Sequence, residues 1–254
     1  MEGTRDVGIS GSTFSPLYSR IAALITINAG VLAIGQWAQA AAGPLFRVWV
    51  GKTAEALPKR FPRIPTEVLV SEATLDQLAS ENHADAVSAV NAAALVFGHS
   101  VTDTVIDELL EISARGVPER WPTDHEEFTL TLKELRQKTL EEYVDKALKR
   151  LVQQQKAKSL PMKVQHLFTI SRCGPAEFGI TLDLDLLAAA DRARHEIVHG
   201  AKFSEPIERL HEMLSANLFA AQAAIFAVAR SCGYHQHSVD HTGIVFKANE
   251  RQES

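Results

Sequence analysis

The residues with the clearest chemical potential lie in one segment, 191–200, with the sequence DRARHEIVHG. Here Arg194 precedes His199 by five positions, and a second histidine, His195, lies between them. A histidine titrates near neutral pH and can transfer protons, whereas the permanently charged guanidinium group stabilises negative charge on phosphoryl oxygens. These residues could therefore cleave RNA without a metal ion, with His199 as the acid/base and Arg194 stabilising the transition state.

The same segment also contains the pattern H-E-x-x-H, which is typical of zinc hydrolases. In this alternative His195 and His199, four residues apart on a helix, bind Zn²⁺, and Glu196 is the general base. The motif needs a third ligand, for which Glu208, Glu212 or a histidine near the C-terminus are candidates without a recognisable pattern.

Helix geometry constrains the metal-free alternative. Five residues correspond to about 500° of rotation, so Arg194 and His199 would lie about 140° apart on a straight helix. Either the last turn of the helix is distorted, or two chains combine their residues at one phosphate. Arg192, seven residues before His199, shares a face with it and is a candidate phosphate contact.

The sequence Arg-His-Glu-Ile-Val-His-Gly at 194–200 resembles the motif of the HEPN family (higher eukaryotes and prokaryotes nucleotide-binding), at the end of the penultimate helix of an all-α domain. The resemblance extends over residues 66–232 in the order of the helices. It implies a metal-independent endoribonuclease that leaves 2′,3′-cyclic phosphate and 5′-OH ends. Arg194, His195 and His199 are then the catalytic residues, although many active members have Asn or Asp at the position of His195.

The resemblance also implies partners. HEPN proteins usually form homodimers whose two motifs line one cleft, and in bacteria they act as toxins or antiviral effectors with a neutralising antitoxin or a sensor protein. No cofactor is implied. An acidic or polar residue near the start of the second helix assists in some members, and Asp103 or His99 could fill that place. We therefore assign four residues to substrate binding: Arg192, Glu196, Lys202 and Asp103. Glu196 is also a candidate ion-pair partner.

A non-catalytic function is a further alternative. An arginine and a histidine at a helix C-terminus can simply interact with free carbonyl groups and the helix dipole. The chain would then be a helical module that binds a nucleotide, RNA or a partner protein through the same surface.

The elements around the motif indicate an all-α protein, an antiparallel helical bundle with an N-terminal helical extension. Apolar residues recur at helical spacing in several segments, and strand signals are few. We expect helices at about 71–97, 101–114, 123–155 and 205–230, and a further helix that ends near Gly200. A turn at 98–100 separates the first two, and a capping box at Thr123 and Glu126 begins the third.

The predicted organisation has five parts: a loose terminus at 1–15, an apolar helical extension at 16–50, a Pro-rich linker at 51–65, the helical domain at 66–232 and a polar tail at 233–254. The extension includes an uncharged stretch, 21–46, that is long enough to cross a bilayer. Its polar residues favour a buried or interface helix over membrane contact.

Composition limits the functional classes. The net charge is −5, so a generally cationic nucleic-acid-binding surface is excluded and any RNA contact must be local. One local candidate is the run from Lys146 to Lys163, which holds six basic and no acidic residues; the alternative is that this run is a solvated helix face. The two cysteines, Cys173 and Cys232, fit a reducing compartment, so we expect a cytoplasmic protein.

Overall fold

The computed structural model describes residues 8–24, 26, 29–30, 33, 72–121, 139–240 and 243–249. Within these ranges the chain is mostly helical, at 77% of residues, and the all-α prediction is confirmed at this level. A helix at 11–24 is followed by α2 (Glu72–Gly116), α4 (Leu140–Lys156), α5 (Leu160–Ser171), α6 (Leu184–Val198) and α7 (Ile207–Ser231), with short 3-10 helices η1 (Pro118–Arg120) and η2 (Pro175–Phe178). A hairpin of β1 (Tyr234–Asp240) and β2 (Gly243–Ala248) ends the described chain.

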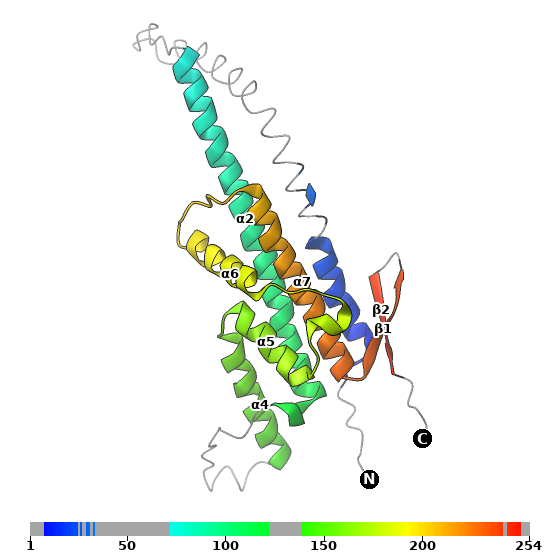
Figure 1. Ribbon diagram of the computed structural model, residues 1–254. Coiled ribbons are helices and arrows are strands. Elements are labelled where there is room, and N and C mark those ends of the chain that lie inside the picture. The colour runs from blue at the N-terminus through cyan, green and yellow to red at the C-terminus, as the bar shows by residue number, and fades with distance from the viewer. Residues whose placement is uncertain are drawn as a thin grey trace, which may run out of the picture.

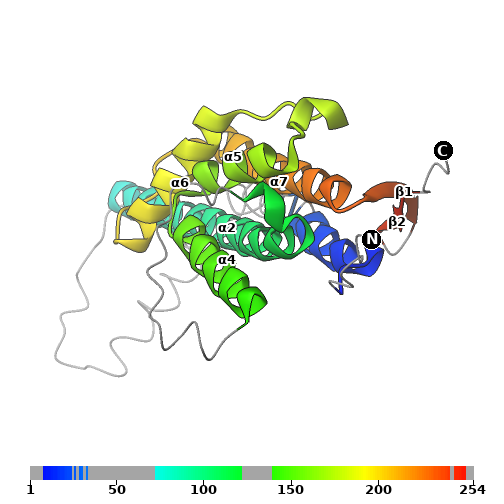
Figure 2. The ribbon, with the colours of Figure 1, turned by 90° about the horizontal axis from the view of Figure 1, so that it is seen from below.

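Helix α7 is the centre of the bundle (Figures 1 and 2), and its segment 223–229 is apolar on every side. All residues from 223 to 229 are buried, because α2, α5, α6, η2 and β1 pack around this helix. A helix that is hydrophobic all round requires such complete coverage. Its many alanines allow neighbouring helices to approach closely, and they are Ala216, Ala220, Ala221, Ala223, Ala224, Ala227 and Ala229.

The longest element, α2, has 45 residues and a length of about 67 Å. Its first turns extend beyond the end of α7, and the rest runs beside α7 (Figure 1). The prediction of two helices separated by a turn at 98–100 is wrong. Gly98 is buried against α7, where an added Cβ would lie 2.7 Å from Leu214 Cδ2. This glycine permits close helix packing instead of a turn.

The helix predicted at 123–155 is also wrong in its extent. A capping box at Thr139 and Glu142 begins α4 at Leu140, and Thr139 has extended backbone angles that end any helix before it. The predicted capping box at Thr123 and Glu126 lies outside the described residues. Helix α5 forms at 160–171, where no helix is predicted.

Aromatic packing joins the two ends of the described chain. Phe14, fully buried in helix 11–24, lies with its ring centroid 5.5 Å from that of Phe246 in β2 and 5.9 Å from that of Tyr234 in β1. The Tyr234 hydroxyl donates a hydrogen bond to the Ile9 carbonyl at 2.8 Å. Residues 11–15 of the predicted loose terminus are therefore helical, and residues 234–240 and 243–248 of the predicted polar tail form paired strands, because these few rings form a shared apolar contact.

The uncharged stretch 21–46 is described only in part. Its first residues are helical, and Ile21 and Leu24 are buried in the main core. Most of 25–50, and the predicted linker at 51–65, lie outside the described residues. Two described helical segments, Val87–Gly116 and Ile207–Ser231, are long and apolar enough to cross a membrane by composition, but burial within the bundle accounts for the second, which is 67% buried.

Gly11 provides a test of the contact between the two ends. A Cβ at this position would overlap the Phe246 carbonyl oxygen, which belongs to backbone that cannot rotate away. We predict that Gly11→Ala lowers the free energy of unfolding by roughly 1–3 kcal/mol, measured by urea denaturation. The control is Gly174→Ala, where nothing lies within 4 Å of the added Cβ. Equal stability of the two variants would contradict this account.

His166 predicts a pH dependence of stability. Its ring packs edge-on against Trp121 at 5.1 Å, and burial, assisted by the positive charge of Lys158, lowers the pKa of His166 from 6.5 to about 4. Between these values the unfolded chain binds a proton here that the folded chain does not, so stability falls as pH drops from 6.5 towards 4. We expect His166→Gln to reduce this loss in melting temperature, whereas replacement of the exposed His211 by Gln should leave it unchanged.

Candidate functional site

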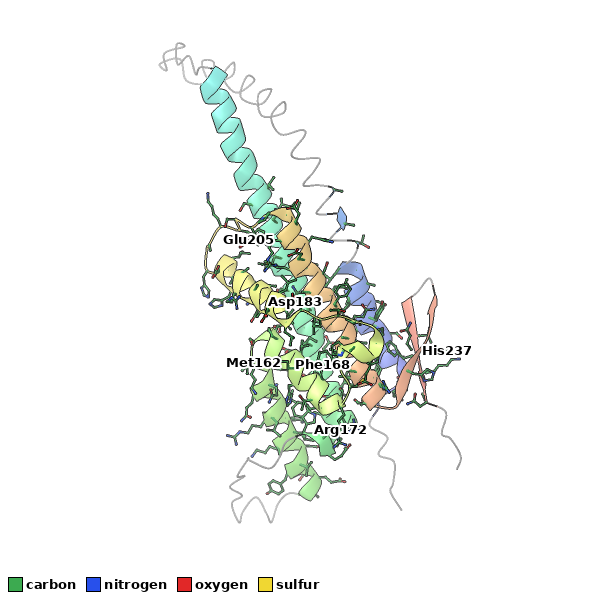
Figure 3. All side chains as sticks on the ribbon, viewed as in Figure 1. Met162, Phe168, Arg172, Asp183, Glu205 and His237 are labelled. Carbon is green, nitrogen blue, oxygen red and sulfur yellow. The ribbon has the colours of Figure 1, made fainter. Side chains whose placement is uncertain are left out.

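The segment 191–200 forms the C-terminal part of α6. The helix begins at Asp183, whose side chain accepts a hydrogen bond from the Leu186 amide at 2.9 Å, and Figure 3 shows this residue near the middle of the bundle. Leu187 and Ala190 are fully buried, and Ala190 joins a small core with residues of α2 and α7. These contacts fix which face of α6 points inward.

The end of α6 is fixed by its backbone. Gly200 has φ +95°, a left-handed conformation that favours glycine. Its amide donates to the Ile197 carbonyl at 2.9 Å, and the Ala201 amide donates to the Glu196 carbonyl at 3.0 Å. This pair of bonds is a Schellman motif. It ends the helix at Val198 and makes His199 the C-cap residue.

His199 lies on the solvent-facing side of α6 with His195. Both side chains are exposed, and their ring centroids are 4.4 Å apart with the rings tilted by 63°. Arg192 and Glu196 are exposed on the same side of the helix, and Lys202 is exposed in the loop that follows. The predicted catalytic histidines and three of the predicted binding residues therefore share one accessible region.

Arg194 lies on the opposite, inward side of α6. It continues the stripe of Leu187 and Ala190 and is half-buried. Its Nε is fully enclosed, and it has no hydrogen-bonding partner among the described residues. Because α6 is regular up to Val198, the helix is not distorted in a way that would bring Arg194 and His199 together. A single chain thus presents the two groups of the motif on different sides of one helix.

Helix α2 faces this inward side with three polar residues spaced four apart, His99, Asp103 and Asp107. The Lys163 ammonium group of α5, only 3% exposed, lies 2.7 Å from Asp103 Oδ1 and 2.8 Å from Asp107 Oδ1. Burial alone would lower the pKa of Lys163, but the hydrogen bonds to both carboxylates outweigh it and raise the pKa above its ordinary value. Asp103, a predicted binding residue, is thus already bound to Lys163.

His99 of α2 contacts Asp191 of α6. Its side chain is 3% exposed, and its Nε2 lies 2.9 Å from Asp191 Oδ1. The ring N–H does not point along this line, so the contact is a close approach of the ring to the carboxylate and not a linear hydrogen bond. This contact outweighs burial and holds the pKa of Asp191 below its ordinary value, and the charges of Arg194 and Lys163 lower that pKa further.

Lys163, Asp107 and Asp191 are part of this arrangement but were not predicted from the sequence. A signal was present, because His99, Asp103 and Asp107 recur at intervals of four and must lie on one helix face. Nothing in the sequence pairs that face with α5 and α6. The basic run behaves differently from a free cationic surface, since Lys163 is buried between carboxylates and Lys156 lies 2.6 Å from Glu111 Oε1.

The zinc alternative lacks a third ligand within the described part of the chain. No group of three or more His, Cys, Asp or Glu side chains there is arranged to hold a metal ion. His235 and His237 lie on β1 of the hairpin, and Figure 3 shows His237 on the side of the molecule away from α6. A ligand to His195 and His199 would have to come from other residues or from another molecule.

A separate cavity of about 520 Å³ lies between the last turns of α2 and α4. Ala114, Leu148 and Val152 line it together with charged residues that include Arg115 and Lys149. It does not include any residue of α6 and is therefore distinct from the region of His195 and His199.

Comparison with known proteins adds no assignment: no protein-family model matches the sequence, and no curated protein and no solved structure gives a significant match. The HEPN resemblance thus depends on the motif at 194–200 and on the order of the helices.

The buried ion pairs of Lys163 predict a cost for its removal. Lys163→Met would leave Asp103 and Asp107 side by side without the positive charge between them. Because both carboxylates are about one-third exposed, we expect a loss of roughly 1–3 kcal/mol in the free energy of unfolding, less than for a fully buried pair. The exposed Lys149 supplies the control, Lys149→Met, and urea denaturation of both variants is the measurement. A K163M variant as stable as K149M would show that these pairs do not stabilise the bundle.

Proposed function

We propose that this protein is a metal-independent endoribonuclease of HEPN type, a cytoplasmic toxin or defence effector that forms 2′,3′-cyclic phosphate and 5′-OH ends. One observation carries the proposal. Helix α6 holds an arginine, Arg194, that has no carboxylate partner within the described residues, and it also holds an exposed histidine, His199, at its C-cap. The helices around α6 then correspond to a HEPN-like antiparallel bundle.

His199 acts as the acid/base in the proposed reaction. Its imidazole takes the proton from a ribose 2′-hydroxyl, whose oxygen attacks the adjacent phosphorus, and the proton is returned to the 5′-oxygen as the P–O bond breaks. Its exposed position allows access to a large substrate. His195, 4.4 Å away between ring centroids, orients His199 or contacts the RNA.

Arg194 stabilises the negative charge that develops on the phosphoryl oxygens. It and His199 point to different sides of α6, so the proposed active site uses the motifs of two chains in a homodimer. Val198, an apolar side chain 55% exposed beside His199, is a surface that a second copy would cover. Arg192, Glu196 and Lys202 are placed to contact RNA around such a cleft, and an antitoxin or sensor protein would regulate access to it.

The separation of Arg194 and His199 within one chain also supports a second candidate function. Without a second copy, an available guanidinium group can bind phosphate but has no acid/base group beside it. The alternative is therefore a non-catalytic helical module that binds a nucleotide, RNA or a partner protein.

We predict that the purified protein cleaves end-labelled RNA in excess EDTA. Arg194→Ala and His199→Ala should each reduce the rate about 100-fold or more, since each removes one half of the chemistry. Arg209→Ala is the matched control, because Arg209 lies on α7 and its guanidinium pairs with Glu212 on the surface. Mapping of the product ends should give cyclic phosphate, and size-exclusion chromatography should give a dimer.

Cleavage that stops in EDTA and returns with Zn²⁺, with Arg194→Ala still active, would favour the zinc hydrolase instead. RNA binding that requires Arg194 but gives no cleavage would favour the non-catalytic module.

A further inference from the structure

We infer that His99 keeps Arg194 available to phosphate by holding the carboxylate of Asp191 away from it. This inference rests on the proposed function, because it explains how the site preserves an uncommitted guanidinium group. His99 would be a positioning residue that acts on Arg194 through Asp191.

Asp191 is the one carboxylate placed to neutralise Arg194 along α6. Residues three or four apart on a helix are neighbours, and the positions so related to Arg194 are Ala190, Asp191, Ile197 and Val198. The charge of Arg194 contributes to the lowered pKa of Asp191, as expected for neighbouring groups of opposite charge. No ion pair within 4.0 Å joins them, however, in the described part of the chain.

The carboxylate of Asp191 is instead directed to α2, where His99 Nε2 lies 2.9 Å from it. His99 is nearly fully buried and has no other hydrogen-bonding partner among the described residues. His99 is thus placed to hold the carboxylate of Asp191 on the side of α6 that faces α2.

Lys163 cannot take over the role of His99 in holding Asp191. Lys163 is held between Asp103 and Asp107 and acts on Asp191 only as a more distant charge. The cluster therefore divides its acids so that Lys163 takes two and His99 takes one. Among the described residues, Arg194 is left with an enclosed Nε that has no hydrogen-bonding partner and with no carboxylate contact.

Loss of His99 should consequently release Asp191 to pair with Arg194, three residues further along the same helix. The guanidinium group would then be occupied by an internal carboxylate that competes with the RNA phosphate. Removal of the carboxylate in the same molecule should restore the guanidinium group, which a purely structural role of His99 does not predict.

The experiment compares H99L, H99Q, D191N and the double variant H99L/D191N. The readouts are RNA cleavage in EDTA and binding of a non-cleavable 2′-O-methyl oligoribonucleotide, measured by fluorescence anisotropy. We expect H99L to lose about tenfold in both, equivalent to one added ion pair that RNA must displace. H99L/D191N should recover to within about threefold of the unchanged protein, and H99Q, whose amide can still donate to Asp191, should keep most of the activity.

A second measurement is independent of any activity. Double-mutant cycles with D191N and R194Q, followed by urea unfolding, give the coupling between Asp191 and Arg194. We expect favourable coupling that is larger in the H99L background than in the presence of His99. This readout also applies if H99L is less stable, as long as it unfolds cooperatively.

The inference is overturned if the coupling is the same in both backgrounds, or if H99L/D191N is as impaired as a folded H99L. It is also overturned if H99L binds and cleaves like the unchanged protein. Absence of RNA cleavage by the unchanged protein, together with coupling that rises in H99L, would instead refute the proposed nuclease while supporting the role of His99.

Discussion

The requirement to bury α7 on all sides organises this protein. Residues 223 to 229 are all buried, so α2, α5, α6, η2 and β1 are each placed as a cover for one part of this helix. Helix α2 takes the longest contact, α5 and α6 close another side, and helix 11–24 reaches it through the stacked rings of Tyr18 and Phe226. Because the surface of α7 is largely alanine, these neighbours approach closely, and Gly98 is needed where α2 meets Leu214.

This packing also explains where the polar groups of the candidate site lie. Helix α6 contributes Leu187 to the main core and Ala190 to the small core, and the next inward position on the same stripe is Arg194. A charged residue on an inward stripe must lie where the apolar contact ends, and here it meets the polar face of α2. The Schellman motif at Gly200 then ends α6 one turn later and leaves His199 in solvent. Apolar packing on one side and helix termination on the other therefore separate the two groups of the motif.

Much of the helical architecture was predictable from periodicity, and the errors have specific physical causes. Gly98 was interpreted as a turn because a glycine's role in close packing depends on a partner, Leu214, that is distant in sequence. The C-terminal end of α6 and the start of α7 were predicted closely because Gly200 and Pro206 mark them locally. The region 234–248 was assigned to a polar tail because its strands pair only with each other and gain their burial from Phe14, far away in the chain.

The candidate site shows the same division. The spacing of Arg194, His195 and His199 fixes their relative directions on a helix, and the structure has His195 and His199 together and Arg194 apart from them. The contacts of Lys163 and His99 were not predictable, because they join α2 to α5 and α6 across 60 and 92 residues of sequence. The spacing of residues along one helix identifies candidate groups. The charges around those groups depend on which other helices pack beside that helix.

The contact between helix 11–24 and the hairpin has a consequence for biosynthesis. The rings of Phe14, Tyr234 and Phe246 can meet only when residues more than 200 positions apart are both present. During translation the apolar side of helix 11–24 therefore stays uncovered by its aromatic partners until nearly all of the described chain has been synthesised. Such a late, long-range contact slows the completion of folding and leaves apolar surface open to aggregation in the nascent chain. A chaperone that binds helix 11–24 during synthesis would be displaced when the hairpin, which is synthesised much later, packs against this helix.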